Sequence, residues 1–367
     1  MTGTPYLFGS AAAQRRADLT VYDSLACAGL ELSGTGAPRR PLLVVELDDL
    51  HDADPTTISR IAEAADNALP LVIGVLRRPP TTALAPVLAA TTCTLTDLPD
   101  PNPLPQLVRV DDLEAGLDQL RGAVAHSPQA ALACGQLLRR TGPPDTIGAL
   151  ADEAAVYSML LGGNEFARWL AERGPARPAR PRPAALVRLH RAADRLSIVL
   201  DHPERRNAFS ARMREELLDA MHVAAADPGI TQIELGGAGT AFCSGGDLDE
   251  FGTAADPVSA YLVRLDRAPW RIMDKVRDRI TARVHGACVG AGAEFATFAD
   301  TVVAAPDTYF LLPEVRMGLV PGAGGTVSIP RRIGRWRAAW LMLTGQRLSA
   351  TTALRWGLVD RIEEPGR

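Results

Sequence analysis

The stretch that decides the fold is Thr240-Ala-Phe-Cys-Ser-Gly-Gly-Asp-Leu248. The apolar run before it, Ile230–Gly236, predicts a strand, and the small residues of the stretch predict a tight turn. We expect a helix to begin at the glycines, over Gly245–Phe251. A turn of this kind exposes backbone N–H groups at a helix N-terminus, where developing negative charge is stabilised.

A second element of the same kind is Val284-His-Gly-Ala-Cys-Val-Gly-Ala-Gly-Ala-Glu-Phe295. Its beginning overlaps a predicted strand, Ile280–His285, and its end overlaps a predicted helix, Ala291–Ala299, whose first turn holds Glu294. Further along the chain, Glu314 lies in an irregular segment just before another Gly-rich loop. The second half of the chain therefore combines two glutamates with two turns that expose backbone N–H groups.

Six segments of the second half resemble the crotonase (enoyl-CoA hydratase/isomerase) superfamily, and they follow the order of that family. They are Arg206-Asn-Ala-Phe-Ser210, Ala241-Phe-Cys-Ser-Gly-Gly-Asp-Leu248, His285-Gly-Ala-Cys-Val-Gly-Ala-Gly-Ala-Glu294, Pro313-Glu-Val-Arg-Met-Gly-Leu319, Pro321-Gly-Ala-Gly-Gly325 and Leu343-Thr-Gly345 before Gly357-Leu-Val-Asp360. Each segment alone is a weak signal, but together they are specific. The resemblance covers roughly half the chain and implies an α/β fold with a crotonase-like (ββα) spiral catalytic domain.

The resemblance also implies which residues act on a substrate. The backbone N–H groups of Ser244 and Ala291 would form an oxyanion hole for a coenzyme A thioester and its enolate. Glu294 would orient and deprotonate water, and Glu314 would protonate the α-carbon, because adding water to an α,β-unsaturated thioester needs both steps. From the residues alone, both glutamates could instead be helix-terminus carboxylates that the helix dipole favours.

The segment around Arg206 is implied to line the coenzyme A channel. Substrate or coenzyme A contacts are expected at Arg206, Ala208, Gly245, Asp247 and Gly290. From its sequence position, Arg206 could approach a phosphate group or lie on the surface.

At one position where family members contact coenzyme A, this chain has different residues. Where family members often present a lysine to a coenzyme A phosphate, this chain has Cys134-Gly135. The contact is therefore lost, or it is supplied by Arg139 or Arg140.

A proline-rich segment divides the chain nearly in half. Gly174–Pro183 contains four prolines, which forbid a continuing helix and predict an extended linker over residues 174–183. We expect a first domain at residues 1–173 and the catalytic domain at residues 184–367. In the first domain, strands are predicted at Pro41–Leu47, Pro70–Leu76 and Leu107–Val110, and helices at Pro55–Ala68, Ala83–Thr91, Asp111–Ala125, Pro128–Arg140 and Thr146–Arg173.

The first domain resembles a degenerate crotonase unit. Pro70-Leu-Val-Ile-Gly-Val75 resembles the strand that leads into the second Gly-rich element, but the ten residues Arg77–Pro86 contain neither glycine nor glutamate. The helical region at about 111–173 resembles the C-terminal region of a crotonase, which the second half lacks. We expect these helices to cover the catalytic domain of the same chain or of a neighbouring protomer, within a homo-trimer or hexamer.

Composition excludes several classes of protein. The 367 residues carry a net charge of −4, with 47% hydrophobic and 22% charged residues, as in an ordinary globular chain. No long basic block indicates a nucleic-acid partner, and no apolar stretch reaches the roughly 20 residues that cross a bilayer. The cysteines form no CxxC pair and the histidines show no metal-ligand spacing. We expect a cytoplasmic protein with free thiols, no metal, no cofactor other than the coenzyme A of its substrate, and no membrane partner.

The function predicted from these observations is that of an enoyl-CoA hydratase acting on a 2-enoyl-CoA. A crotonase-type isomerase or acyl-CoA hydrolase remains open, because the same oxyanion hole serves those reactions. A non-catalytic acyl-CoA-binding subunit is the alternative from another class. The acyl group cannot be read from the sequence, since the apolar stretch Phe251–Asp278 fits an acyl pocket or an ordinary packed helix.

Overall fold

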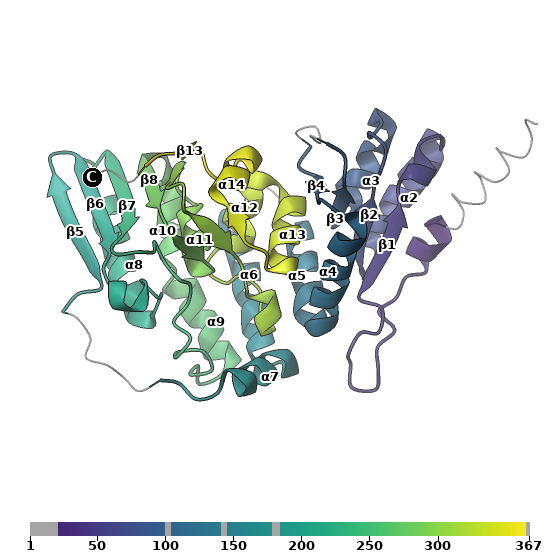
Figure 1. The fold of residues 1–367 in the computed structure, drawn as a ribbon. Helices are drawn as coiled ribbons and strands as arrows, with labels where there is room; N and C mark the ends of the chain where they lie inside the picture. Colours follow the sequence, from purple (N-terminus) through teal and green to yellow (C-terminus); the bar gives the residue numbers. More distant parts are fainter. Residues whose placement is uncertain (1–20, 100–103, 141–144, 178–183, 365–367) are drawn as a thin grey trace, which may run out of the picture.

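The structure of the protein is a computed structural model that describes residues 21–99, 104–140, 145–177 and 184–364. Two main sheets lie at opposite ends of the molecule, and a layer of helices separates them (Figure 1). The N-terminal sheet belongs to the first half of the chain and the larger sheet to the second half. The helices between them come from both halves.

The N-terminal sheet is parallel throughout and has the strand order β1-β2-β3-β4. Its strands are β1 (Leu42–Glu46), β2 (Leu71–Val75), β3 (Cys93–Thr96) and β4 (Leu107–Arg109), with α2 (Pro55–Asn67) and α3 (Ala85–Ala90) as crossovers. The sequence of β2, Leu-Val-Ile-Gly-Val, is buried along its whole length, as expected for a parallel strand covered on both faces. Asp54 caps α2 by accepting hydrogen bonds from the N–H groups of Thr56 and Thr57.

The larger sheet has the strand order β13-β10-β8-β7-β6-β5 and is parallel except for the β5–β6 hairpin. Its strands are β5 (Val187–Ala192), β6 (Arg195–Leu200), β7 (Gln232–Gly237), β8 (Ile280–Val284), β10 (Thr301–Ala304) and β13 (Arg361–Ile362). The parallel order β7-β8-β10-β13 repeats the order β1-β2-β3-β4 of the first half. This likeness favours the interpretation of the first half as a degenerate unit of the same kind, which stays a prediction.

A small third sheet, β12-β11-β9, includes part of the second Gly-rich element in β9 and the segment just before Glu314 in β11. Its strands are β9 (Ala287–Val289), β11 (Tyr309–Leu311) and β12 (Leu348–Ser349). The helices of the second half are α8 (Ala211–Ala226), α9 (Pro257–Asp266), α10 (Pro269–Lys275), α11 (Ala291–Ala296), α12 (Gly325–Ile333), α13 (Arg335–Thr344) and α14 (Ala350–Trp356). No helix among the described residues is long and apolar enough to cross a membrane.

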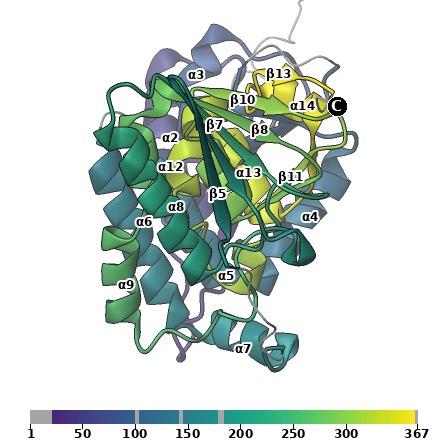
Figure 2. The ribbon, with the colours of Figure 1, turned by 90° about the vertical axis from the view of Figure 1, so that its left-hand side faces the viewer.

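Four helices of the first half pack on the second half of the same chain. They are α4 (Leu113–His126), α5 (Pro128–Arg140), α6 (Thr146–Leu161) and α7 (Asn164–Arg173). Both α4 and α5 contact α13, and α6 contacts α9 and α12; Figure 2 shows α6 and α9 side by side. One continuous hydrophobic core runs through this layer and includes Leu71, Cys134 and Trp340. The helices therefore cover the second half within one chain, a choice that the sequence left open.

Two expected helices differ from the structure. The single stretch predicted at Thr146–Arg173 is two helices, because the chain turns at Gly162-Gly163 between α6 and α7. The helix predicted at Gly245–Phe251 is wrong, because this segment is a series of turns. There the Asp247 N–H donates to the Phe209 carbonyl, and the Asp247 carboxylate accepts from the Asp249 N–H, which replaces a helical ladder with local bonds.

The predicted linker lies partly outside the described residues, at 178–183. Its described beginning is attached to the second half, because Arg177 forms an ion pair with Asp249 at 3.2 Å. One end of the first half is thus held close to the first Gly-rich element.

We predict that residues 185–367 alone are poorly soluble or inactive. Without the first half, the faces of α12 and α13 that contact α4, α5 and α6 become exposed apolar surface, which favours association. Sedimentation of the isolated second half measures this association. Co-expression of residues 1–177 as a separate chain is the control and restores a soluble complex. A soluble, fully active monomer of the second half would show that the first half is an independent module.

Candidate active site

The two Gly-rich elements lie side by side and are joined by backbone hydrogen bonds. The Cys243 N–H donates to the Ala287 carbonyl at 3.1 Å, and the Val289 N–H donates to the Cys243 carbonyl at 3.0 Å. The elements approach so closely that a Cβ atom at Gly292 would lie 2.7 Å from the Cβ of Cys243. Only glycine fits this position, which brings the start of α11 against the first element.

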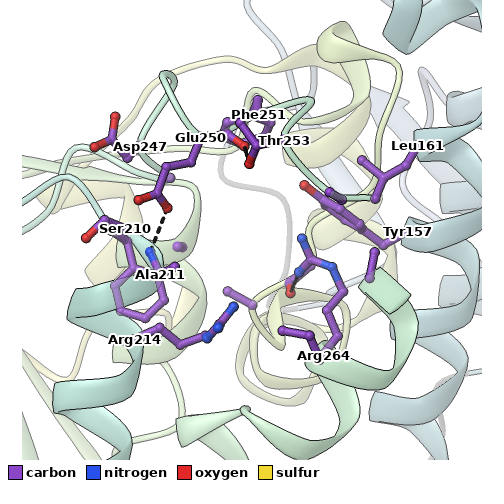
Figure 3. A pocket seen from close by; sticks show the side chains of 18 of the residues that line it. Tyr157, Leu161, Ser210, Ala211, Arg214, Asp247, Glu250, Phe251, Thr253 and Arg264 are labelled. Carbon is purple, nitrogen blue, oxygen red and sulfur yellow. Dashed lines mark hydrogen bonds between the residues drawn. The ribbon is translucent and has the colours of Figure 1, made fainter. Parts of the chain in front are cut away.

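A cavity of about 390 Å³ opens beside these elements. Both halves of the chain line it: Tyr157 and Leu161 come from α6, and the rest of the lining comes from the second half (Figure 3). The residues that carry chemistry in this lining are Glu294, Glu314, Asp247, Glu250, Arg214, Arg264 and the N-terminal residue of α11, Ala291. The two predicted catalytic glutamates therefore face one cavity.

Glu294 is buried in the first turn of α11, where the sequence placed it. Its Oε2 atom accepts hydrogen bonds from the N–H groups of Ala323 at 2.7 Å and Gly325 at 3.0 Å. A Cβ atom at Gly325 would lie 2.5 Å from the Cγ of Glu294, so the loop approaches the glutamate closely. These bonds hold the carboxylate in place and leave Oε1 without a hydrogen bond from the described residues.

Glu314 is buried opposite Gly290, before a short 3₁₀ turn. Its Oε2 atom is buried and accepts no hydrogen bond from the described residues. Because burial disfavours the charged form, the pKa of Glu314 is raised to about 8. Glu314 therefore holds its proton at neutral pH.

A third buried carboxyl group, Glu153 on α6, reaches the same region. Its Oε1 accepts from the Gly324 N–H at 2.7 Å, and its Oε2 accepts from the N–H of Thr326 at 3.0 Å and from the Thr326 hydroxyl at 2.7 Å. Burial raises the pKa of Glu153 to about 7, although these hydrogen bonds lower it. The first half thus supplies a carboxyl group that supports the loop around Glu294.

Sequence reasoning missed Glu153. The available signal was an acidic residue on the buried side of the apolar helix Thr146–Leu161, one turn before Tyr157. A buried carboxylate needs hydrogen-bond donors, and the donors here lie 171 and 173 residues further along the chain.

The three carboxyl groups act on one another. The pKa of Glu294 is raised well above its ordinary value by burial first, and then by repulsion from Glu314 and Glu153. Since like charges at short range cannot all ionise together, the cluster holds protons at a pH at which isolated glutamates are charged. Such a cluster can both donate and accept protons near neutral pH.

The two backbone N–H groups expected to form an oxyanion hole differ in their hydrogen bonding. Ala291 lines the cavity at the N-terminus of α11, and its N–H has no acceptor among the described residues. The expectation of a free donor at Ser244 is not met, because its N–H donates to the Arg206 carbonyl at 3.0 Å. The reason is the local backbone: Arg206 has a φ of 52° and turns its carbonyl toward Ser244.

The turn that contains Arg206 is fixed by a neighbouring side chain. The Asn207 Nδ2 group donates to the carbonyls of Ala238 and Ala241, both at 2.9 Å, and its Oδ1 accepts from the His202 N–H at 2.8 Å. These bonds stabilise two successive residues with positive φ, Arg206 and Asn207.

The expected coenzyme A contacts occupy different environments. Asp247 lines the cavity, whereas Arg206 is exposed and Ala208 is buried. Gly245 and Gly290 have positive φ angles of 95° and 47° and form the close-packed backbone behind the cavity. Asp247 pairs with Arg205, which the sequence analysis did not select, and not with Arg206.

The two alternative phosphate contacts are engaged elsewhere. Arg139 donates to the backbone carbonyls of Asp66 at 3.1 Å and Ala68 at 2.8 Å, and so ties α5 to the end of α2. Arg140 pairs with Asp152 at 3.2 Å on the surface. In the part of the chain that the structure describes, no group of three or more His, Cys, Asp or Glu side chains is arranged to hold a metal ion.

Comparison with known proteins identifies the second half. Residues 193–364 match the family described as enoyl-CoA hydratase/isomerase. This part of the chain belongs to that family. The expected crotonase-superfamily membership and the expected α/β class are confirmed. That the first half is a degenerate unit of the family stays a prediction.

Two curated relatives and one solved structure are similar to the second half. A probable enoyl-CoA hydratase of Rhodobacter capsulatus is 39% identical over 165 residues, which are 44% of this chain and 62% of the relative. The 1,2-epoxyphenylacetyl-CoA isomerase of Escherichia coli is 35% identical over 172 residues, 46% of this chain and 65% of that protein. A crystal structure of an enoyl-CoA hydratase from Thermoplasma volcanium aligns with a TM-score of 0.46 and 33% identity, covering 50% of this chain and 73% of that one. The chain thus spans less than two thirds of the length of the two curated relatives.

We predict that Gly290→Ala destabilises the protein by about 1–3 kcal/mol and lowers its activity. The φ of Gly290 is 47°, and a Cβ atom there would lie 2.5 Å from Oε1 of Glu314. Denaturant unfolding measures the loss of stability. Gly236→Ala is the matched control, because a Cβ atom there meets nothing within 4 Å. Equal stability of the two variants would contradict the packing of Gly290 against Glu314.

We predict that thermal stability falls as pH rises from 5 to 8. With a folded-state pKa of about 8 and an ordinary value of 4.5, Glu314 keeps a proton in the folded chain that the unfolded chain has lost. Stability therefore decreases with pH across this window. Melting curves of the wild type should show a decrease of about 3 °C or more, and Glu314→Gln should show a smaller one. An identical slope in both proteins would show that Glu314 ionises normally.

Proposed function

We propose that the protein is an enoyl-CoA hydratase, which adds water across the double bond of a 2-enoyl-CoA. The observation that carries the proposal is that Glu294 and Glu314 line one cavity next to the unpaired N–H of Ala291. Hydration needs one group that activates water and another that delivers a proton to the α-carbon. The hydratase names of relatives such as the Rhodobacter capsulatus protein support the same reaction.

In the proposed mechanism, Glu294 starts the reaction. Its Oε2 is held by the loop N–H groups, so Oε1 is the atom that receives a proton from water. The water oxygen forms a bond to the β-carbon, and the electron pair of the double bond moves into the thioester carbonyl. The enolate oxygen accepts a hydrogen bond from the Ala291 N–H, and Ser244 becomes a second donor when its N–H exchanges the Arg206 carbonyl for this oxygen.

Glu314 completes the reaction by giving its proton to the α-carbon, which restores the thioester carbonyl. A carboxyl group with a pKa of about 8 is protonated at neutral pH and fits the role of acid. Burial and repulsion from Glu314 and Glu153 raise the pKa of Glu294 as well, but two loop N–H donors favour its ionised form, which the role of base requires. In each turnover Glu294 gains one proton and Glu314 loses one. Proton exchange with solvent then restores the starting protonation states of both glutamates.

An isomerase is the second candidate, favoured by the similarity to the 1,2-epoxyphenylacetyl-CoA isomerase of Escherichia coli. The same N–H donor and the same cavity would stabilise an enolate in either reaction. The two reactions differ in their need for water activation. The requirement for Glu294 therefore separates them.

We predict that Glu294→Gln and Glu314→Gln each lower hydration about 10²-fold or more, because each removes a proton-transfer group. Loss of the conjugated-thioester absorbance of crotonyl-CoA and of longer enoyl-CoAs measures the rate. Both variants should stay folded and bind acyl-CoA. Glu250→Gln is the control at the cavity wall, where Glu250 accepts from the Ala211 N–H at 2.6 Å, and it should lose less than tenfold.

Each outcome of this experiment has a definite meaning. Wild-type rates in both glutamate variants would contradict the hydratase mechanism. If only Glu314 proved necessary, the isomerase would be favoured. Acyl-CoA binding without turnover by the wild type would indicate a non-catalytic binding subunit.

A further inference from the structure

Arg264 of α9 stands in the wall of the cavity near the proposed reaction centre. Its Nη1 donates to the Gly322 carbonyl at 2.6 Å, and its guanidinium lies 3.4 Å from the centre of the Tyr157 ring. Gly322 directly precedes Ala323, whose N–H binds Glu294. These contacts hold the guanidinium at a fixed place on the cavity wall.

The charge of Arg264 has no carboxylate partner within 4.0 Å among the described residues. The other arginine of the cavity wall, Arg214, donates from Nε and Nη2 to Glu215 at 3.2 Å and 2.7 Å. Figure 3 shows both arginines directed toward the cavity, from α8 and α9. Of the two, Arg264 forms no salt bridge among the described residues, although its charge acts on Glu153, and it retains N–H donors beyond the one used on Gly322.

Apolar side chains contribute to the lining of the cavity that Arg264 faces. Among them are Leu161, Val263 and Trp270, and Tyr157 offers the face of its ring to the guanidinium. A guanidinium without a salt-bridge partner on a cavity wall favours an anionic group with two oxygens, because a carboxylate can accept two parallel N–H bonds.

On the basis of the proposed function, we propose that the acyl group of the substrate carries a carboxylate, which Arg264 binds. The thioester end lies at Ala291 between the glutamates, and the distal end of the acyl chain extends to Arg264. The ionised carboxylate of Glu294 would repel such a substrate, and the guanidinium offsets this repulsion. Arg264 is thus a specificity-determining residue that takes no part in proton transfer.

Binding of unreactive ligands by the full-length protein tests this inference. The ligands are hexanoyl-CoA and its analogue with a carboxylate at C6, which have equal chain length and no double bond. The wild type should bind the carboxylate analogue at least tenfold more tightly. Arg264→Met should weaken binding of the analogue about 10- to 100-fold more than binding of hexanoyl-CoA, as expected for loss of a charged hydrogen-bonded pair.

Two further variants complete the design. Arg264→Lys keeps the charge without the planar fork and should restore part of the preference. Arg267→Met, at the end of the same helix but outside the cavity lining, is the matched control and should keep the wild-type preference. Calorimetric binding and a melting curve of each variant establish that it is folded.

The outcomes separate this inference from the proposed reaction. Equal affinities of the wild type for both ligands, or equal losses for both in Arg264→Met, would overturn it, and the latter would assign Arg264 to support of the loop. Hydration of the matching 2-enoyl-CoAs is measured separately. If neither were hydrated but the affinity difference remained, the hydratase proposal would fail and the carboxylate site would stand.

Discussion

The site depends on one arrangement, in which two carboxylates share the N–H groups of a single loop. Along Ala323–Thr326, the first and third N–H groups donate to Glu294, and the second and fourth donate to Glu153. These donors lie at the N-terminus of α12, where backbone N–H groups have no partners within the helix and the dipole favours negative charge. The two glutamates accept hydrogen bonds from N–H groups that would otherwise lack partners, and these N–H groups in turn fix the position of Glu294.

The same arrangement distinguishes the three buried carboxyl groups from one another. Glu153 and Glu294 have N–H donors that favour the ionised form, whereas one oxygen of Glu314 is buried without a partner. A buried carboxylate without hydrogen bonds is far less stable than a buried carboxylic acid. Burial raises the pKa of all three groups, but Glu314 receives none of the loop N–H donors that oppose this effect at Glu294 and Glu153, and this difference follows from where α12 begins.

The sequence could predict the parts of the site that are local. The Gly-rich segments single out Glu294 and Glu314, which line one cavity, because the backbone conformations there depend on glycine at neighbouring positions. It could not predict the contact of Glu153 with Thr326, which depends on packing between distant elements. Nor could it predict the bond from the Ser244 N–H to the Arg206 carbonyl, because a positive φ at an arginine has no sequence signal of its own.

The first half of the chain contacts the cavity wall in two places. Helix α6 supplies Tyr157 and, through Glu153, supports the loop that holds Glu294. Arg173, at the end of α7, donates to the carbonyls of Leu248 and Phe251. The segment between these two carbonyls follows the first Gly-rich element and lines the cavity. Because packing depends on which surfaces meet and not on their order along the chain, helices that precede the second half in the sequence can complete its site.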